Sequence, residues 1–280
     1  MMFKRAFNFF IYSSIFVSLC AVIMVAQTNI LFHLEYEKFP FFFFVFCSTL
    51  CSYNFHWWLT PYAPNGSMRN EWNQGNRILM VFFCILGLIG AAYTGWGLRN
   101  HWMALGIGVF ATFLYTAPKI PYGAFRKLSK IAVGKTIFLS FVWMYVTTAL
   151  PILVSDANFN FAHLLFCSSR FFLIFAICIL FDYKDREEDR RQGIVSMVTR
   201  FSDQNIMKLY LLTVLIFGLS SAALYFYDIP FLDVITILLA IIPLLGLKNY
   251  ARTHFGDYLY YFVLDGLMMA SALITVFIRI

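Results

Sequence analysis

The segment FAHLLFCSSRFFLIFAICILFDYKDREEDRRQG, residues 161–193, joins a long apolar run directly to the densest group of charged residues in the chain. Arg170 is the one charged residue in the apolar part, which ends at Phe181. A helix rises about 1.5 Å per residue, so about 20 apolar residues cross the roughly 30 Å hydrocarbon layer of a membrane. The segment therefore predicts a membrane-spanning helix that ends at a highly charged surface.

The composition of the whole chain favours the same environment. Of its 280 residues 61% are hydrophobic, 20% are aromatic and only 12% are charged, which is far from the composition of a soluble domain. The net charge of +7 would suit nucleic acid, but the basic residues lie in loops between apolar runs, so no nucleic-acid partner is predicted. The segments of alternating polarity that a membrane barrel requires are missing. We therefore expect an all-α, polytopic membrane bundle that forms one domain over residues 1–280.

Apolar runs between charge and turn signals predict nine membrane spans. They are residues 7–31, 39–59, 78–98, 102–118, 136–155, 161–181, 206–226, 229–247 and 258–278. An odd number of spans places the two termini on opposite sides, and the side of the N-terminus then holds seventeen of the 21 Lys and Arg residues. Because basic loops stay in the cytoplasm, we expect a cytoplasmic N-terminus, an external C-terminus and three long cytoplasmic loops at 60–77, 119–135 and 182–205.

The cysteines give no sign of a disulfide framework or a zinc site. All six lie within apolar segments and lack the paired loop spacings of such sites. We interpret them as small buried hydrophobic residues.

Three aspartates follow the sixth span with the spacing D-x-x-D-x-x-x-D: Asp182, Asp185 and Asp189. If the helix continues past the membrane, offsets of three and seven place the carboxylates on one face. Mg²⁺ prefers oxygen ligands and is commonly bound by one or two carboxylates together with substrate phosphates. The interleaved basic residues would then contact a diphosphate, since guanidinium groups match phosphate oxygens; they are Lys184, Arg186, Arg190 and Arg191. The alternative is a solvated charged loop with internal ion pairs.

In this pattern the chain resembles the UbiA superfamily of intramembrane prenyltransferases. The resemblance rests on nine spans, on the D-x-x-D-x-x-x-D motif after the sixth, and on the residues that follow that motif, Gly193, Ser196 and Thr199. A Y-P-basic pattern in the middle loop adds Tyr115, Pro118, Lys119, Arg126 and Lys130. The resemblance implies a helical bundle with a lipid-open central cavity. It also implies that Mg²⁺ at two aspartate-rich motifs ionises an isoprenyl diphosphate, whose allylic cation alkylates an acceptor.

The chain departs from the family pattern at the first aspartate-rich motif, N-D-x-x-D-x-x-x-D, expected at the end of the second span. Asn54 is present, but Phe55, Trp58 and Tyr62 occupy the three aspartate positions. None of them ligates Mg²⁺ as a carboxylate does, so the sequence predicts one Mg²⁺ at Asp182, Asp185 and Asp189.

Neighbouring polar residues are candidates to replace the missing motif. Tyr53, Asn54 and a protonated His56 would donate hydrogen bonds to the substrate, although an interfacial histidine is an equal alternative for His56. In the middle loop Lys119, Arg126 and Lys130 would neutralise the leaving diphosphate, although the positive-inside rule also explains them. The candidate catalytic residues are Asp185, Asp189, Lys119 and Arg126. The candidate substrate-binding residues are Tyr53, Asn54, His56, Tyr115, Lys130, Arg186 and Arg190.

Two charged residues lie within apolar spans, Arg170 and Asp265. Ionisable groups inside a membrane are costly and often functional, so each is a candidate for an intramembrane pair or for a cavity lining.

Three functions remain open from the sequence. The first is a membrane prenyltransferase that uses Mg²⁺, a prenyl diphosphate and a lipophilic or aromatic acceptor. The second is an isoprenoid-binding relative that has lost catalysis, which the missing aspartates favour. The third is a small transporter, a class that usually shows internal repeats or charges at the bilayer midplane.

Overall fold

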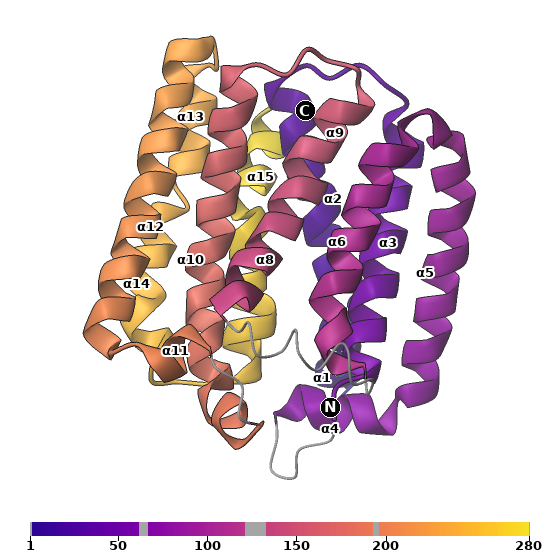
Figure 1. Cartoon of the computed structure of the whole chain (residues 1–280), viewed down its shortest axis with the longest axis vertical. Helices are drawn as coiled ribbons and strands as arrows, with labels where there is room; N and C mark the ends of the chain where they lie inside the picture. Colours follow the sequence, from indigo (N-terminus) through magenta and orange to yellow (C-terminus); the bar gives the residue numbers. More distant parts are fainter. Residues whose placement is uncertain (1, 62–66, 121–132, 193–195, 280) are drawn as a thin grey trace.

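The structure is a computed structural model that describes residues 2–61, 67–120, 133–192 and 196–279. Every regular element in these ranges is a helix, and none is a strand. The long helices run side by side along one axis, and the two termini lie at opposite ends of the bundle (Figure 1). The all-α, polytopic fold predicted from the apolar runs is therefore confirmed.

The helices in chain order fall into two halves. The first half contains α1 (Met2–Tyr12), α2 (Ile15–Leu31), α3 (Lys38–Trp58), α4 (Met68–Gly75), α5 (Arg77–Gly97), η1 (Arg99–His101), α6 (Trp102–Thr116) and η2 (Ala117–Lys119). The second half contains α8 (Val133–Met144), η4 (Tyr145–Ala149), α9 (Leu150–Val154), α10 (Phe161–Gln192), α11 (Met197–Arg200), α12 (Asp203–Ala223), η5 (Leu224–Tyr227), α13 (Phe231–Leu238), α14 (Ile241–Ala251), η6 (Leu259–Leu264) and α15 (Asp265–Arg279).

The number of helices that are long and apolar enough to cross a membrane is six within the described residues, or seven if the bent pair α1–α2 counts as one span. Two predicted spans fall outside this set. Helix α6 has only 15 residues, and α3 has 21 but ends in the polar and aromatic stretch SYNFHWW. The count of nine is therefore not confirmed, although α3 and α6 run along the bundle beside α5 and α8 (Figure 1).

The predicted first span, residues 7–31, is broken in two. Helices α1 and α2 meet at an angle of 57°, and Ser14 between them has a left-handed backbone with φ 70°. The Asn54 side chain of α3 donates a hydrogen bond of 3.0 Å to the carbonyl oxygen of Ser13. An unsatisfied peptide group inside a membrane costs several kcal/mol, so Asn54 stabilises the break.

A second irregularity lies in the middle of the fifth predicted span. Residues Tyr145–Ala149 form a π-helical turn just before Pro151. Proline has no N–H to donate to the carbonyl four residues earlier, which belongs to Thr147. The Thr28 hydroxyl of α2 donates a hydrogen bond of 2.7 Å to that carbonyl instead, so α2 and η4 are joined in the core of the bundle.

Helix α10 is longer than its predicted span. It runs from Phe161 to Gln192 and so continues eleven residues beyond the predicted end at Phe181. Lys, Arg and Glu favour helices, and Glu187 and Arg190, three residues apart, form an ion pair at 3.3 Å. The condition for placing Asp182, Asp185 and Asp189 on one helix face is therefore met.

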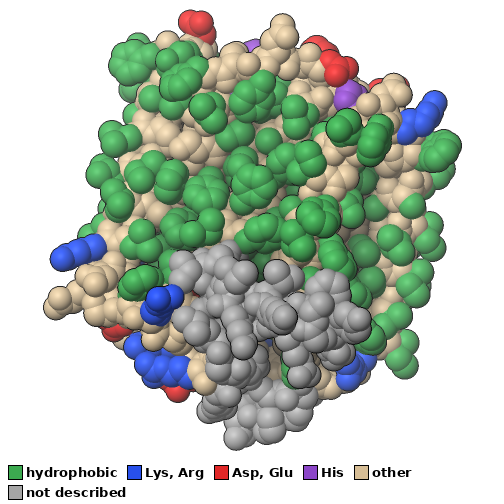
Figure 2. All heavy atoms as spheres, viewed as in Figure 1, with side chains coloured by type: hydrophobic (Ala, Val, Ile, Leu, Met, Phe, Trp, Pro, Cys, Tyr) green, Lys and Arg blue, Asp and Glu red, His purple; other side chains and the backbone are tan. Residues whose placement is uncertain are grey.

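The surface separates by polarity along the bundle axis. Hydrophobic side chains cover a broad central band, and most Lys and Arg side chains visible in this view lie toward the end that holds the N-terminus (Figure 2). Lipid-facing side chains such as Ile78, Tyr93 and Phe110 are more than 60% exposed. Such a band agrees with an integral membrane protein.

Candidate functional site

Helix α10 carries the three predicted aspartates to the N-terminal end of the bundle. The side chains of Asp182 and Asp189 are each only 4% exposed, and Asp185 is half-buried. The Thr136 hydroxyl of α8 donates a hydrogen bond of 2.8 Å to Oδ2 of Asp182. Ionised carboxylates are rarely buried unless they have partners, so this face of α10 is not a simply solvated loop.

A buried ion pair lies beside these aspartates. The Lys184 ammonium is 2.6 Å from Oδ1 of Asp257, which lies just before η6. The backbone N–H of Arg69, in the first turn of α4, donates a hydrogen bond of 2.7 Å to Oδ2 of the same carboxylate. Asp257 thus joins the loop after the second predicted span, the end of α10 and the start of the last helix.

The Arg69 side chain is enclosed by aromatic rings. Its guanidinium carbon lies 4.1 Å from the ring centre of Trp57 and 4.6 Å from that of Tyr261. The residue is 2% exposed, and neither Nε nor Nη2 of Arg69 has a hydrogen-bond partner in the part of the chain that the structure describes. Burial lowers the pKa of Arg69. We call Trp57, Arg69, Lys184, Asp257 and Tyr261 the basic–aromatic cluster.

Lys119 lies against the same cluster from η2. Its ammonium donates a hydrogen bond of 2.5 Å to the Thr60 hydroxyl and lies 5.5 Å from the ring centre of Trp57. The structure thus brings predicted Lys119 close to Arg69 through their shared contact with Trp57. Arg126 and Lys130 lie outside the described residues.

His56 and Tyr115 pack against each other between α3 and α6. Their rings stack at 4.9 Å with an angle of 12°, and the Thr116 hydroxyl lies 3.4 Å from Nδ1 of His56. The two predicted substrate-binding residues are therefore neighbours across α3 and α6.

Tyr53 and Asn54 are also tied into the protein. The Trp143 indole N–H donates a hydrogen bond of 3.0 Å to the Tyr53 hydroxyl. The Asn54 amide donates hydrogen bonds to the carbonyl oxygens of Ser13 and Leu50, whereas its buried Oδ1 has no partner among the described residues. Asn54 holds the α1–α2 break, which no local sequence pattern predicts.

Arg186 and Arg190 point to other partners. Arg186 lies 3.5 Å from Asp203, and Arg190 lies 3.3 Å from Glu187 in an exposed pair. The structure therefore does not bring these two predicted substrate-binding residues into the basic–aromatic cluster.

The three carboxylates of α10 are spread along two turns of the helix. Asp185 and Asp189, four residues apart, have neighbouring Cβ atoms about 5–6 Å apart, whereas Asp182 and Asp189 are separated by about 10 Å along the helix. Among the described residues there is no group of three or more His, Cys, Asp or Glu that would enclose a metal. An ion at this face would therefore need substrate phosphates and water to complete its ligands.

The two intramembrane charges do not pair with each other. Arg170 donates hydrogen bonds from Nη2 to Oε1 of Gln27 at 2.8 Å and to the Met24 carbonyl oxygen at 3.3 Å. Gln27 in turn donates to the Thr275 hydroxyl at 2.9 Å. Arg170 thus belongs to a polar network between α10, α2 and α15, and Asp265 is not part of it.

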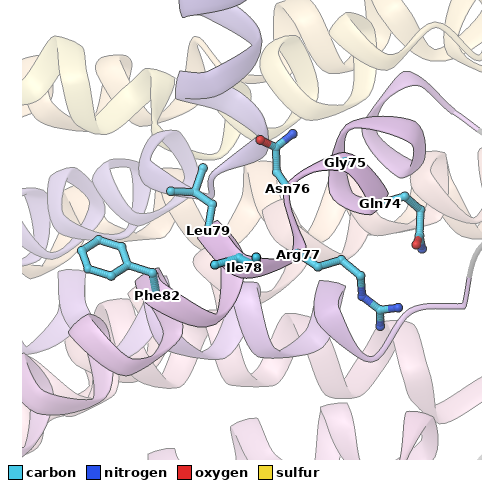
Figure 3. Close-up of a pocket in the computed structure, with 7 residues that line it drawn as sticks. All are labelled: Gln74, Gly75, Asn76, Arg77, Ile78, Leu79 and Phe82. Carbon is cyan, nitrogen blue, oxygen red and sulfur yellow. The ribbon is translucent and has the colours of Figure 1, made fainter.

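An open surface pocket of about 620 Å³ lies at the corner between α4 and α5. Gln74, Asn76 and Arg77 line its polar side, and Leu79 and Phe82 line its apolar side (Figure 3). None of the predicted site residues lines it, so it is a feature of the protein surface apart from the carboxylates.

Sequence reasoning missed most of the basic–aromatic cluster. From sequence, Arg69 is an ordinary basic residue of a predicted cytoplasmic loop and Trp57 is an aromatic residue at the end of a span, and no pattern singles out Asp257. One signal in the sequence could have pointed to Arg69: it is a basic residue shortly after the position of the missing first aspartate-rich motif. Its burial depends on Tyr261, which is distant in sequence.

Known proteins agree with this architecture. The sequence profile of the UbiA prenyltransferase family matches residues 74–256, and no curated protein sequence matches the chain. The fold is similar to the apo structure of a UbiA homolog from Aeropyrum pernix K1, with a TM-score of 0.68 and 11% identity over 95% of this chain and 98% of that one. A structure from a study of digeranylgeranylglyceryl phosphate synthase in membranes is also similar, with a TM-score of 0.60 and 12% identity over 99% of this chain and 100% of that one. By its sequence profile and its fold, the chain belongs to the UbiA prenyltransferase family.

Proposed function

We propose that the chain is a membrane prenyltransferase that moves an isoprenyl group from a prenyl diphosphate to a lipophilic or aromatic acceptor. The observation that carries this proposal is the burial of charges of both signs at one end of a UbiA-type bundle. Asp182, Asp189 and Arg69 are each at most 4% exposed, and the Lys184 side chain is 9% exposed. Such burial is costly without a binding function to retain it.

The candidate residues have three different roles in the proposed reaction: metal binding, stabilisation of the diphosphate and positioning of the substrates. Asp185 and Asp189 would hold one Mg²⁺, which neutralises diphosphate oxygens when bound. Lys119 lies close enough to the cluster to stabilise the leaving diphosphate, with Arg126 and Lys130 as further candidates from the middle loop. The stacked pair His56 and Tyr115 and the bonded Tyr53 and Asn54 position the walls around the reacting groups.

The aromatic side chains suit the carbon part of the reaction. A prenyl diphosphate that loses its diphosphate leaves an allylic cation, which the faces of aromatic rings stabilise. Trp57, Tyr261 and Tyr53 lie at the site, and Trp143 donates to the Tyr53 hydroxyl. We place this end of the bundle on the cytoplasmic side, because most Lys and Arg residues gather there.

The second candidate function is isoprenoid binding without catalysis. Phe55 and Trp58 stand where the first motif would supply carboxylates, and their rings stack on each other at 6.4 Å. Apolar packing at these positions favours a single metal or none. A transporter function has no comparable support from the site.

The test is diphosphate release by the purified protein from a panel of prenyl diphosphates, with Mg²⁺ and a panel of phenols and long-chain alcohols. For Asp185→Asn we expect the rate to fall by about 100-fold or more, because one of the two Mg²⁺-binding carboxylates is lost. Glu187→Gln, on the same helix with a 73% exposed side chain, is the matched control and should keep the wild-type rate. Unchanged turnover in Asp185→Asn would exclude the proposed metal site, and Mg²⁺-dependent binding without any product would favour the non-catalytic function.

A further inference from the structure

Asp265 is a buried carboxylate inside the last membrane helix. It follows the π-helical turn η6 and is 8% exposed. Among the residues that the structure describes, none donates a hydrogen bond to it or forms an ion pair with it. Tyr261, four residues earlier on the same segment, contacts both Arg69 and Lys184. A buried carboxylate without a partner is expensive in a membrane and marks a functional site by default.

Arg69, which packs against Tyr261, is a buried cation with hydrogen-bond donors that lack acceptors among the described residues. Its Nε and Nη2 are buried and have no acceptor among the described residues. Tyr261 stacks on the guanidinium and lies four residues before Asp265, so both point to the same side of their helix. The two unsatisfied groups therefore border one buried region.

No ion pair joins Arg69 and Asp265, although opposite charges attract strongly in a medium of low dielectric constant. Aromatic packing holds them apart, because Trp57 and Tyr261 enclose the guanidinium. A bound molecule that accepts hydrogen bonds near Arg69 and donates one to Asp265 would satisfy both groups. Such a molecule, or a pair of molecules, would extend from Arg69 at the end of the bundle to Asp265 inside the last membrane helix.

Resting on the proposed function, we propose that Asp265 is the catalytic base of the transfer and acts on an acceptor that carries a neutral hydroxyl group, while Arg69 binds the diphosphate of the donor. Lys184, 4.0 Å from the ring centre of Tyr261, adds a second cation on the diphosphate side. Asp265 lies about one helical turn deeper than Tyr261, where the first carbon of the donor meets the acceptor.

The charges on both sides select the acceptor class. A protonated amine would be repelled by Arg69 and Lys184, and a carboxylate would be repelled by Asp265 and has no proton for that base to accept. A phenol or an alcohol carries no charge and supplies the one proton that the carboxylate can accept. We therefore assign a hydroxyl-bearing acceptor and no amine or acid.

The reaction balances with these groups alone. The bond between the first carbon of the donor and the diphosphate oxygen breaks, and its electron pair leaves with the diphosphate, which Arg69 stabilises. The acceptor oxygen, or a ring carbon of a phenol, forms the new bond to the allylic carbon. The proton displaced from the acceptor passes to the Asp265 carboxylate, which becomes a carboxylic acid and later returns the proton to solvent.

The experiment separates transfer to acceptor from ionisation of the donor. For Asp265→Asn we expect transfer to fall by about 100-fold or more, in the usual range for loss of a general base. Release of diphosphate without acceptor, with the prenyl alcohol as product, should persist with the donor KM within about threefold of wild type. Arg69→Met should raise the donor KM by about tenfold or more, the loss expected for a hydrogen bond between charged groups.

Asp233→Asn is the matched control, because Asp233 is also a buried carboxylate in a membrane helix but forms an ion pair with Arg279. It should leave both rates unchanged. If Asp265→Asn does not fold, wild-type protein supplies a second test: the O-methyl ether of the acceptor, assayed as a competitive inhibitor of transfer, should have an inhibition constant about tenfold above the KM of the acceptor. Transfer by Asp265→Asn within about threefold of wild type, or an inhibition constant of the ether equal to the KM of the acceptor, would overturn the assignment of Asp265. A wild-type protein that releases no diphosphate from any donor would overturn the proposed function as well.

Discussion

Asp257 connects three segments that are far apart in sequence. Its carboxylate accepts from the Lys184 ammonium and from the Arg69 backbone, and the residue is 4% exposed. Removing one partner of a buried ion pair leaves a charge without compensation, which costs more than the pair itself contributes. The Lys184–Asp257 pair should therefore control stability at this end of the bundle.

We predict that Lys184→Met lowers the free energy of unfolding by about 3–5 kcal/mol, the cost usual for leaving one buried charge unpaired. In the double variant Lys184→Met and Asp257→Asn, the neutral amide still accepts from the Arg69 N–H, so the loss should be smaller than the sum of the two single losses. Denaturation in detergent, followed by tryptophan fluorescence, measures each value. Arg190→Met breaks an exposed pair and should cost about 1 kcal/mol or less. Additive losses in the double variant would show that the two charges are not coupled.

At the scale of elements, the close packing of α5 on α3 depends on Gly87. A methyl group at this position would lie 2.6 Å from the Cys47 carbonyl oxygen and 2.8 Å from the Cys51 amide nitrogen. Both are backbone atoms of α3 and cannot rotate away. The two helices approach this closely only because Gly87 has no side chain.

We predict that Gly87→Ala destabilises the protein by about 1–3 kcal/mol, the usual cost of overpacking. Gly106→Ala on α6 is the control, since a methyl group there meets nothing within 4 Å. Because alanine favours helices over glycine, the control should be neutral or more stable by up to about 1 kcal/mol. Thermal inactivation in detergent compares the two, and equal stability of both variants would contradict the close approach.

The elements show why some features followed from sequence and others did not. The hydrocarbon layer requires long apolar helices, so α10, α12 and α15 were predictable from residue type alone. The break at Ser13 and Ser14 was not, because it depends on the Asn54 amide arriving from α3. Helix α10 also continues into its charged end, where the Glu187–Arg190 pair supports the helix, whereas a composition count ends a span at the first charges.

At the scale of the whole molecule, the two ends of the bundle differ in charge. This difference predicts which end faces the cytoplasm. We expect Asp156→Cys, whose parent side chain is 84% exposed, to react with a membrane-impermeant maleimide in intact cells. Glu187→Cys at the opposite end should react only after permeabilisation, because its basic surroundings remain in the cytoplasm. The six native cysteines lie within apolar helices, four of them buried, so their background labelling should be low. Labelling with the opposite sidedness would contradict the predicted topology.

The site was predictable in part, for a reason that concerns the whole fold. The spacing of Asp182, Asp185 and Asp189 was readable because one helix carries all three. Arg69 and Asp257 meet across 188 residues, and no local pattern reports such a contact. The positive-inside rule also accounts for basic residues in cytoplasmic loops without any binding role. From sequence, Arg69 is therefore not distinguishable from the other basic residues of these loops.

The meeting of Arg69, Lys184 and Asp257 has a consequence for how the protein is made. The ribosome delivers Arg69 and Lys184 long before Asp257, which follows Arg69 by 188 residues. Until Asp257 is synthesised, Lys184 has no anionic partner from that residue, and α4 has no anchor from it for its first turn. The order of synthesis therefore places closure of the site after insertion of α10, α12 and α14, so a chain truncated before residue 257 would lack the contact that joins α4 to α10.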